Sequence, residues 1–248
     1  TWFQFLLATN ESKHAWMDEG FTSYIDDAAL NAALNLNKTV PNDGAYKDYV
    51  SWVSKGLEEP LTTHADRFKF NQGYGTSSYD KGSIFLSQLG YIIGEENLYK
   101  TMQLYFKKWA FKHPRPYDFI RCAEKVSGLE LDWYLMDWAQ TTKQIDYQIN
   151  SIIGEGSKTK IVLKREKQMP MPIDVLVRLK NGTSQLYNIP LTMMRGHRPL
   201  EGAKLLESWS WAQPYYVFEV NVSKEDLLEV VIDPLGFTAD VNRKNNSL

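Results

Sequence analysis

The 248 residues are enough for one large domain or two ordinary ones, each with a sizeable apolar core. The formal net charge of −2 argues against a nucleic-acid partner, and no run of about 18 apolar residues predicts a membrane span. The single cysteine, Cys122, excludes an internal disulfide framework and is expected to be a small buried hydrophobe within a helix.

The chain up to residue 143 has the periodicity of helices. Residues 18–36 place Phe21, Ile25 and Ala28 three or four positions apart, which is typical of one buried helix face. Asp18 and Glu19 stand where we expect this helix to begin, and negative charge there suits the helix dipole. The same periodicity predicts further helices over residues 79–94, 96–112, 115–128 and 131–140, the third of them ending at Gly128 as a C-cap.

After residue 143 the apolar period changes to two. Strands are expected over residues 160–166, 172–191, 215–222 and 228–234, and Asn181-Gly182 within the second stretch predicts a hairpin. Turn signals recur at the spacing typical of a sandwich. We therefore predict a helical domain over residues 1–143 and an antiparallel immunoglobulin-like β-sandwich over residues 144–248, with a frayed polar tail at residues 242–248.

Two short motifs carry the functional signal. Residues 16–24 read WMDEGFTSY, and residues 77–82 read SSYDKG, with Tyr79 sixty positions after Glu19. The first resembles the W-x-N-E-G-F-A-x-Y block of the aminopeptidase N / leukotriene hydrolase family, and the second resembles that family's Y-x-K-G motif. The opening TWFQ also resembles the segment that follows H-E-x-x-H in this family. Asp18 departs from the usual Asn, and the Gly and Pro that usually follow Trp138-Ala-Gln are absent.

The resemblance implies a zinc metallopeptidase of the gluzincin group, and this part of the chain would form the helical C-terminal half of a thermolysin-like catalytic domain. In that group two histidines of H-E-x-x-H and a later glutamate hold the zinc, and the glutamate of the motif is the general base. By the family's spacing Glu19 would be the third protein ligand, and the second histidine would fall just before Thr1. Tyr79 would be the catalytic phenol that stabilises the oxyanion. The aromatic segment 70–79 is expected to border the substrate cleft.

The function implied for the intact protein is hydrolysis of peptide bonds at peptide N-termini, with zinc as cofactor and a peptide as partner. This chain alone would keep one of three protein ligands and no general base, so we expect it to bind no catalytic zinc and to be inactive. The apolar residues within 2–7 (Trp2, Phe3, Phe5, Leu6 and Leu7) are expected to be the buried continuation of the zinc helix. In this chain alone, the apolar surface left bare around them predicts self-association. The compartment stays open between cytoplasm and a bacterial periplasm or envelope.

Other interpretations compete with this one. A binding or scaffold relative that kept the shape and lost the metal is one alternative. An unrelated hydrolase that uses carboxylates such as Asp26 or Asp27 is another. Glu19 could serve only as a helix N-terminal carboxylate and Tyr79 only as a core tyrosine. Lys81 and Gly82 have a structural interpretation, a solvated or ion-paired lysine and a glycine for close helix packing.

Overall fold

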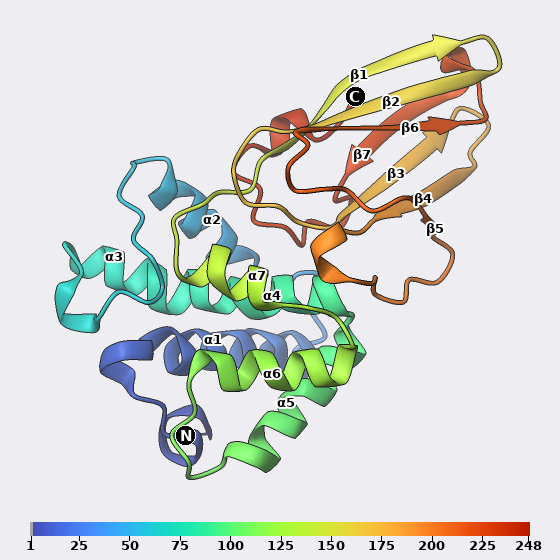
Figure 1. The fold of residues 1–248 in the computed structure, drawn as a ribbon. Helices are drawn as coiled ribbons and strands as arrows, with labels where there is room; N and C mark the ends of the chain where they lie inside the picture. The colour runs from blue at the N-terminus through green and yellow to red at the C-terminus, as the bar shows by residue number, and fades with distance from the viewer. Residues whose placement is uncertain (1) are drawn as a thin grey trace. The chain divides into compact units, whose positions relative to one another are not determined.

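The structure is a computed structural model that describes residues 2–248 and divides into two compact units, Thr1–Thr142 and Lys143–Leu248 (Figure 1). The first unit is helical and the second is built of strands, so the predicted order of helices before strands is correct. None of the described helices combines the length and the apolar character that a membrane span requires.

The helical unit contains both α-helices and short π- or 3₁₀-helical turns. Two helices around residues 43–53 and 71–75 were not predicted, although the first buries aromatic residues at helical spacing. In chain order the elements are η1 (Trp2–Leu7), α1 (Glu11–Ala33), α2 (Asp43–Val53), η2 (Ala65–Arg67), α3 (Asn71–Gly75), η3 (Thr76–Lys81), α4 (Gly82–Ile93), α5 (Glu95–Trp109), α6 (Pro116–Ser127), α7 (Asp132–Tyr134) and η4 (Leu135–Ala139).

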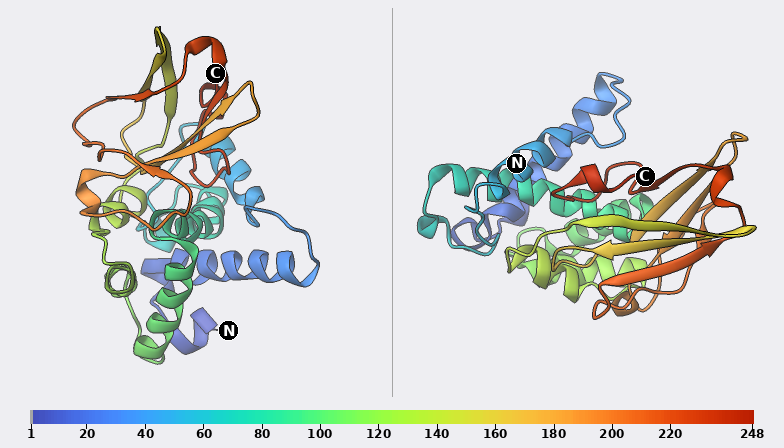
Figure 2. Two further views of the ribbon diagram at one scale, coloured as in Figure 1. Left: turned by 90° about the vertical axis from the view of Figure 1, so that its right-hand side faces the viewer. Right: turned by 90° about the horizontal axis from the view of Figure 1, so that it is seen from above.

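Helix α1 begins earlier than the sequence pattern predicts. Its N-cap is Asn10, whose side chain accepts a hydrogen bond from the backbone N–H of Lys13. The backbone leaves the helical region at His14, with φ −138° and ψ 42°, and the regular helix resumes at the next residue. Asp18 therefore lies in the first turn after this kink and not at the start of the helix. The C-terminal part of α1 extends beyond the neighbouring helices (Figure 2) and is mostly exposed.

Helix α4 is the centre of this unit, because all twelve of its residues are buried. Its three buried polar side chains, Ser83, Ser87 and Gln88, are hydrogen-bonded to Asn42 and Tyr134. Aromatic rings from other elements surround it. The rings of Phe85 and Tyr134 stack with their centroids 5.0 Å apart, and the Trp16 ring lies 4.9 Å from that of Phe85. Cys122 of α6 is buried, as predicted, and Gly128 caps α6 with φ 73°.

The β unit has two sheets, one of three strands in the order β1-β2-β6 and one of four strands in the order β5-β4-β3-β7 (Figure 1). The pairing is antiparallel except between β4 and β5, which run parallel. The sheets contact each other through rings such as Tyr187 and Phe218, 5.2 Å apart. The immunoglobulin-like topology remains a prediction. The strands are β1 (Tyr147–Glu155), β2 (Lys158–Arg165), β3 (Ile173–Leu179), β4 (Ser184–Ile189), β5 (Lys204–Leu205), β6 (Tyr215–Val220) and β7 (Leu227–Ile232).

Two local predictions for this unit have different outcomes. The hairpin at Asn181-Gly182 is present between β3 and β4, and Gly182 takes the φ of 86° that the turn requires. The C-terminal tail, predicted to fray, is instead paired with β7. The backbone N–H of Val230 donates to the carbonyl of Leu248, and the N–H of Leu248 donates back to Val230. The polar composition of the tail misled the prediction because its hydrogen bonds come from the backbone.

Candidate functional site

Glu19 and Tyr79, which the sequence motifs singled out, lie together in the helical unit. Glu19 is half-buried on α1, and Tyr79 of η3 remains 40% exposed. The Tyr79 phenol lies close enough to the Glu19 carboxylate to interact with its charge. Burial first, and then the neighbouring Glu19 carboxylate, raise the pKa of Tyr79 to about 12. The phenol therefore stays protonated, and remains a hydrogen-bond donor, at neutral pH.

A close crossing of two backbones brings these side chains together. A Cβ atom on Gly20 would lie 2.5 Å from the Cα of Gly82 and 2.7 Å from the carbonyl oxygen of Ser78. A Cβ on Gly82 would lie 3.0 Å from the Cα of Gly20. Only glycine allows two helices to approach this closely. The predicted packing role of Gly82 is confirmed, and its partner Gly20 is the immediate neighbour of Glu19.

Lys81 is held on the inner side of the same turn. Its side chain is 1% exposed, and its Nζ lies 2.7 Å from Oε1 of Glu58, which is also buried. The ammonium donates to the carbonyl of Thr141 at 3.2 Å and lies 5.1 Å from the centre of the Trp138 ring. Burial lowers the pKa of Lys81, and the Glu58 carboxylate acts in the opposite direction. Of the two structural interpretations of Lys81, the ion pair is correct and the solvated lysine is wrong.

Two hollows of about 420 and 410 Å³ flank Tyr79, and both are lined by Asp48, Tyr79 and Asp80. Gln72, Gly75 and Thr76 complete part of the first, so segment 70–79 borders it. The second hollow is lined by the further carboxylates Asp26, Asp27 and Asp43, of which only Asp26 and Asp27 were candidates from the sequence, and those for an unrelated hydrolase. Burial raises the pKa of Asp80 to about 7, and the charges of Asp48 and Asp27 act in the same direction. Asp48 and Asp80 carry no motif signal and were missed.

Asp18, the departure from the family's usual Asn, is buried beneath the site. Only 5% of the residue is exposed. Burial, together with the neighbouring charges of Glu19 and Glu11, raises the pKa of its carboxyl to about 6. A buried carboxyl that keeps its proton up to about pH 6 is a poor metal ligand below that pH, because a ligand must be deprotonated. Glu19 is therefore the carboxylate that can act as an acceptor at the site, whereas the Asp18 carboxyl lies in the interior.

The donor groups at the site fit a zinc ion only in part. A zinc site with an open catalytic position takes three protein ligands, and carboxylate oxygen is one of the ligand types. Glu19 suits one such position because its carboxylate is partly exposed and borders a phenol donor. Within residues 2–248, however, no three His, Cys, Asp or Glu side chains are grouped closely enough to hold a metal ion. Glu19 can thus supply one of the three protein ligands of a zinc site, and the other described residues do not supply the remaining two.

Comparison with known proteins identifies the family. Residues 1–138 match the peptidase family M1 domain, and this match covers more than half of the chain, so the chain belongs to that family. Aminopeptidase N of Streptomyces lividans is 28% identical over 146 residues, which are 56% of this chain and 17% of that protein. Leucyl aminopeptidase of Saccharolobus solfataricus is 24% identical over 246 residues, 95% of this chain and 28% of that protein.

A solved aminopeptidase structure is similar to this chain in fold. The crystal structure of Legionella pneumophila aminopeptidase A in complex with aspartic acid matches with a TM-score of 0.57 and 14% sequence identity. The match covers 94% of this chain and 24% of that one. The chain thus spans between about a sixth and about 28% of the lengths of these aminopeptidases. Family membership rejects the unrelated hydrolase that would use Asp26 or Asp27.

Proposed function

We propose that the protein to which these residues belong is a zinc-dependent aminopeptidase, and that the helical unit forms part of its catalytic domain. Glu19 contributes one zinc ligand, and the other two are histidines of the whole protein outside these 248 residues. Tyr79 is the catalytic phenol. The observation that carries the proposal is the close Gly20–Gly82 crossing, which brings together Glu19 and Tyr79, two residues selected separately by family motifs sixty positions apart.

The chemistry of this chain's own residues follows from that geometry. Zinc, when bound, would polarise the peptide carbonyl and activate a water molecule. Tyr79 keeps its proton at neutral pH because its pKa is about 12, so it can donate a hydrogen bond to the carbonyl oxygen as negative charge develops there. The carboxylates that line the hollows beside Tyr79 favour a cationic group. The protonated α-amino group of a peptide is such a group, which supports cleavage at the N-terminus.

Variants of the whole protein can separate the role of Glu19 as a zinc ligand from the role of Tyr79 as the catalytic phenol. We expect Glu19→Gln to lower the zinc content, because a neutral amide is a weaker ligand, and to abolish hydrolysis of aminoacyl anilides. Tyr79→Phe is expected to keep the zinc and to lower kcat by about 10²–10³, with little change in KM. The scaffold alternative expects no zinc and no hydrolysis in the unmodified protein. Zinc measured by mass spectrometry, together with anilide kinetics, decides between the two.

We also propose that the 248-residue chain by itself binds no catalytic zinc and has no peptidase activity. One carboxylate cannot close a tetrahedral site. Dialysis of the chain against zinc, followed by metal analysis and an anilide assay, tests this directly. Stoichiometric zinc that is lost on Glu19→Gln substitution would contradict the proposal.

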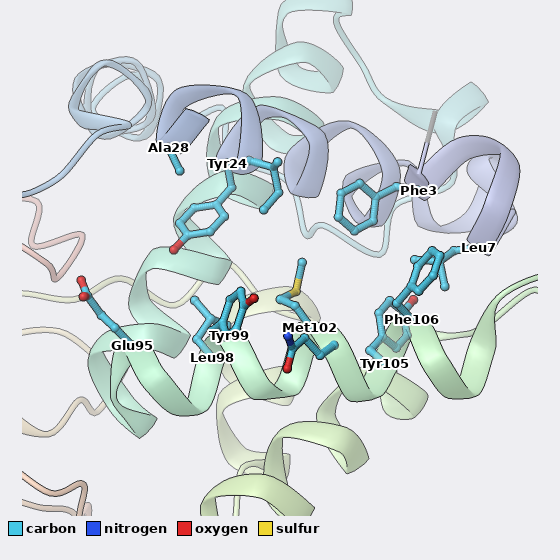
Figure 3. Close-up of a pocket in the computed structure, with 12 residues that line it drawn as sticks. Phe3, Leu7, Tyr24, Ala28, Glu95, Leu98, Tyr99, Met102, Tyr105 and Phe106 are labelled. Atoms are coloured by element: carbon cyan, nitrogen blue, oxygen red, sulfur yellow. The ribbon is translucent and has the colours of Figure 1, made fainter. Parts of the chain in front are cut away.

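Self-association of the isolated chain is proposed on a specific surface. A groove of about 470 Å³ lies between η1, α1 and α5, and Tyr24 of α1 and Tyr99 of α5 border it from opposite sides (Figure 3). Tyr99 is 65% exposed, and so is Phe5 of η1, so the prediction that residues 2–7 form a buried continuation is wrong at Phe5. Phe3 and Leu7 are buried, and the side chain of Trp2 lies outside the described residues.

We expect a second copy to cover this groove, because an apolar hollow rimmed by exposed aromatic rings favours association. Tyr99→Lys would place a charge at its rim and should shift the chain toward the monomer. Leu228→Lys changes an equally exposed apolar residue of the β unit and is the matched control. Light scattering that shows a monomer of the unmodified chain at high concentration would contradict the expectation.

A further inference from the structure

Lys81 and Glu58 form an ion pair that the proposed chemistry does not use. Lysine is almost never fully buried unless it is paired, because removing its charge from water is costly. Lys81 is 1% exposed and the Glu58 side chain 5%. A second oxygen of Glu58, Oε2, is buried and has no hydrogen-bond partner among the described residues. Replacing such a pair by apolar groups is often neutral or stabilising, so stability alone is a weak reason for it.

The pair lies directly behind Tyr79. Tyr79 and Lys81 are two positions apart in η3, so their side chains point to different sides of the turn. Tyr79 points toward the hollows and Glu19, whereas Lys81 points into the interior. A π-helical turn of this kind is uncommon and is frequently found at functional sites. The direction of Tyr79 therefore depends on what fixes this turn.

Lys81 is fixed at both its side chain and its backbone by segments distant in the sequence. Its ammonium contacts Glu58, which follows α2, and the carbonyl of Thr141, which follows η4. Its own carbonyl accepts a hydrogen bond from Nε1 of Trp138 at 3.2 Å. Tyr49 adds a hydrogen bond from its hydroxyl to Oε1 of Glu58 at 3.3 Å. The turn is thus braced from the interior by two separate segments, residues 49–58 and residues 138–141.

We propose that the buried Lys81–Glu58 pair is a positioning device that sets the η3 turn so that the phenol of Tyr79 lies beside Glu19. Lys81 and Glu58 touch no substrate and act through Tyr79. This inference rests on the proposed function, because its catalytic consequence requires Tyr79 to be the oxyanion donor. The Gly20–Gly82 crossing fixes how close the two helices lie, and the ion pair fixes the rotation of the turn that carries the phenol.

The test uses the whole protein with Lys81→Met, and with Lys81→Met combined with Glu58→Gln, which leaves no unpaired charge in the core. We expect kcat to fall by about 10- to 100-fold with KM changed less than about threefold, because the lost interaction belongs to the transition state. In a Tyr79→Phe background the same changes should lower kcat by less than about twofold, since residues that act as a unit are not additive.

Arg198→Met is the matched control, since Arg198 forms a buried ion pair with Asp174 in the β unit. It should lower thermal stability and leave kcat unchanged. A charge-free double variant that folds and keeps full kcat would overturn the proposal. So would a loss of kcat that is equally large with and without the Tyr79 hydroxyl, because that pattern belongs to a general structural role.

Crystal structures of the whole protein and of the double variant separate this proposal from the proposed function. If the whole protein has no peptidase activity, the proposed function fails, yet the position of Tyr79 can still be compared. A phenol that moves away from Glu19 in the double variant supports the positioning role. A phenol that keeps its place beside Glu19 overturns it.

Discussion

Buried carboxylates in the β unit are surrounded by hydrogen-bond donors, whereas the carboxylates beside Tyr79 in the helical unit face other carboxylates. Asp233 accepts hydrogen bonds from three successive backbone amides and from Arg243. Asp174 accepts from Asn188 and forms the buried ion pair with Arg198. These groups hold loops and strands in place, and the fold depends on them.

The carboxylates of the candidate site have the opposite surroundings. Asp80 lies near Asp48 and Asp27, and Asp18 lies near Glu19. In both cases burial and like charges raise the pKa, which means that the folded protein disfavours the ionised form. Groups kept at a cost to stability are typical of functional sites. Burial also raises the pKa of Asp174, but there Arg198 and Asn188 act against the rise, whereas the charges near Asp80 add to it, and this difference in partners separates the two groups.

The largest expected effect concerns a carboxylate of the β unit. Asp174→Ala would leave the guanidinium of Arg198 buried without its partner, and we expect a loss of about 3–5 kcal/mol in the free energy of unfolding. Glu19→Gln in the helical unit should change stability by less than about 1 kcal/mol, because its carboxylate is partly exposed. Urea denaturation of both variants measures the contrast, and equal losses would remove the distinction.

The second-largest effect is expected at the crossing of α1 and α4, where Gly20 meets Gly82. Gly20→Ala would force a methyl group to within 2.5 Å of the Gly82 backbone, so the helices must separate at a cost of about 3 kcal/mol. The matched control is Gly44→Ala on α2, where a Cβ meets nothing within 4 Å. That change should stabilise the protein by about 0.5–1 kcal/mol, because alanine favours a helix. A Gly20→Ala protein as stable as the control would show that the crossing is not tight.

Asp80 predicts a dependence of stability on pH. Its folded-state pKa of about 7 lies above the value of 3.8 expected in the unfolded chain, so its favourable contribution is complete below about pH 4. That contribution is lost as the pH rises through 7. Asp80→Asn should thus stabilise the protein at pH 8 by about 1–2 kcal/mol, less than the full pKa displacement because water reaches the site.

Thermal unfolding of Asp80→Asn and the unmodified protein at pH 4 and pH 8 gives the measurement. The two proteins should unfold at similar temperatures at pH 4 and diverge at pH 8. A difference that is the same at both pH values would contradict the assignment.

The smallest expected effect is at Asp43, whose pKa is shifted in the opposite direction to that of Asp80. Hydrogen bonds from Lys38 and Lys47 hold the pKa of Asp43 at about 2, below its ordinary value. The stability from this group is present above about pH 4 and is lost as the pH falls through 2. Asp43→Asn should therefore cost up to about 0.5 kcal/mol at pH 7, because exposed ion pairs contribute little. The loss should shrink in high salt, and a loss unaffected by salt would argue against the ion pairs.

Local patterns predicted much of the secondary structure because they depend on neighbours a few residues apart. Apolar spacing identified α4, α5 and α6, and Gly128 identified the end of α6. The same patterns missed the start of α1, where Asn10 caps an irregular turn. They also missed the pairing of the tail with β7, because a backbone hydrogen bond leaves no trace in side-chain composition.

By itself the sequence determined the family, the order of helices before strands, and the identity of Glu19 and Tyr79 as a pair worth testing. Only the tertiary structure decided that these two side chains meet, that Gly20 is the contact for Gly82, and that Lys81 is buried against Glu58. The reason is physical. Each of these contacts joins segments more than twenty positions apart, and its energy depends on distances and burial that exist only once the helices have packed.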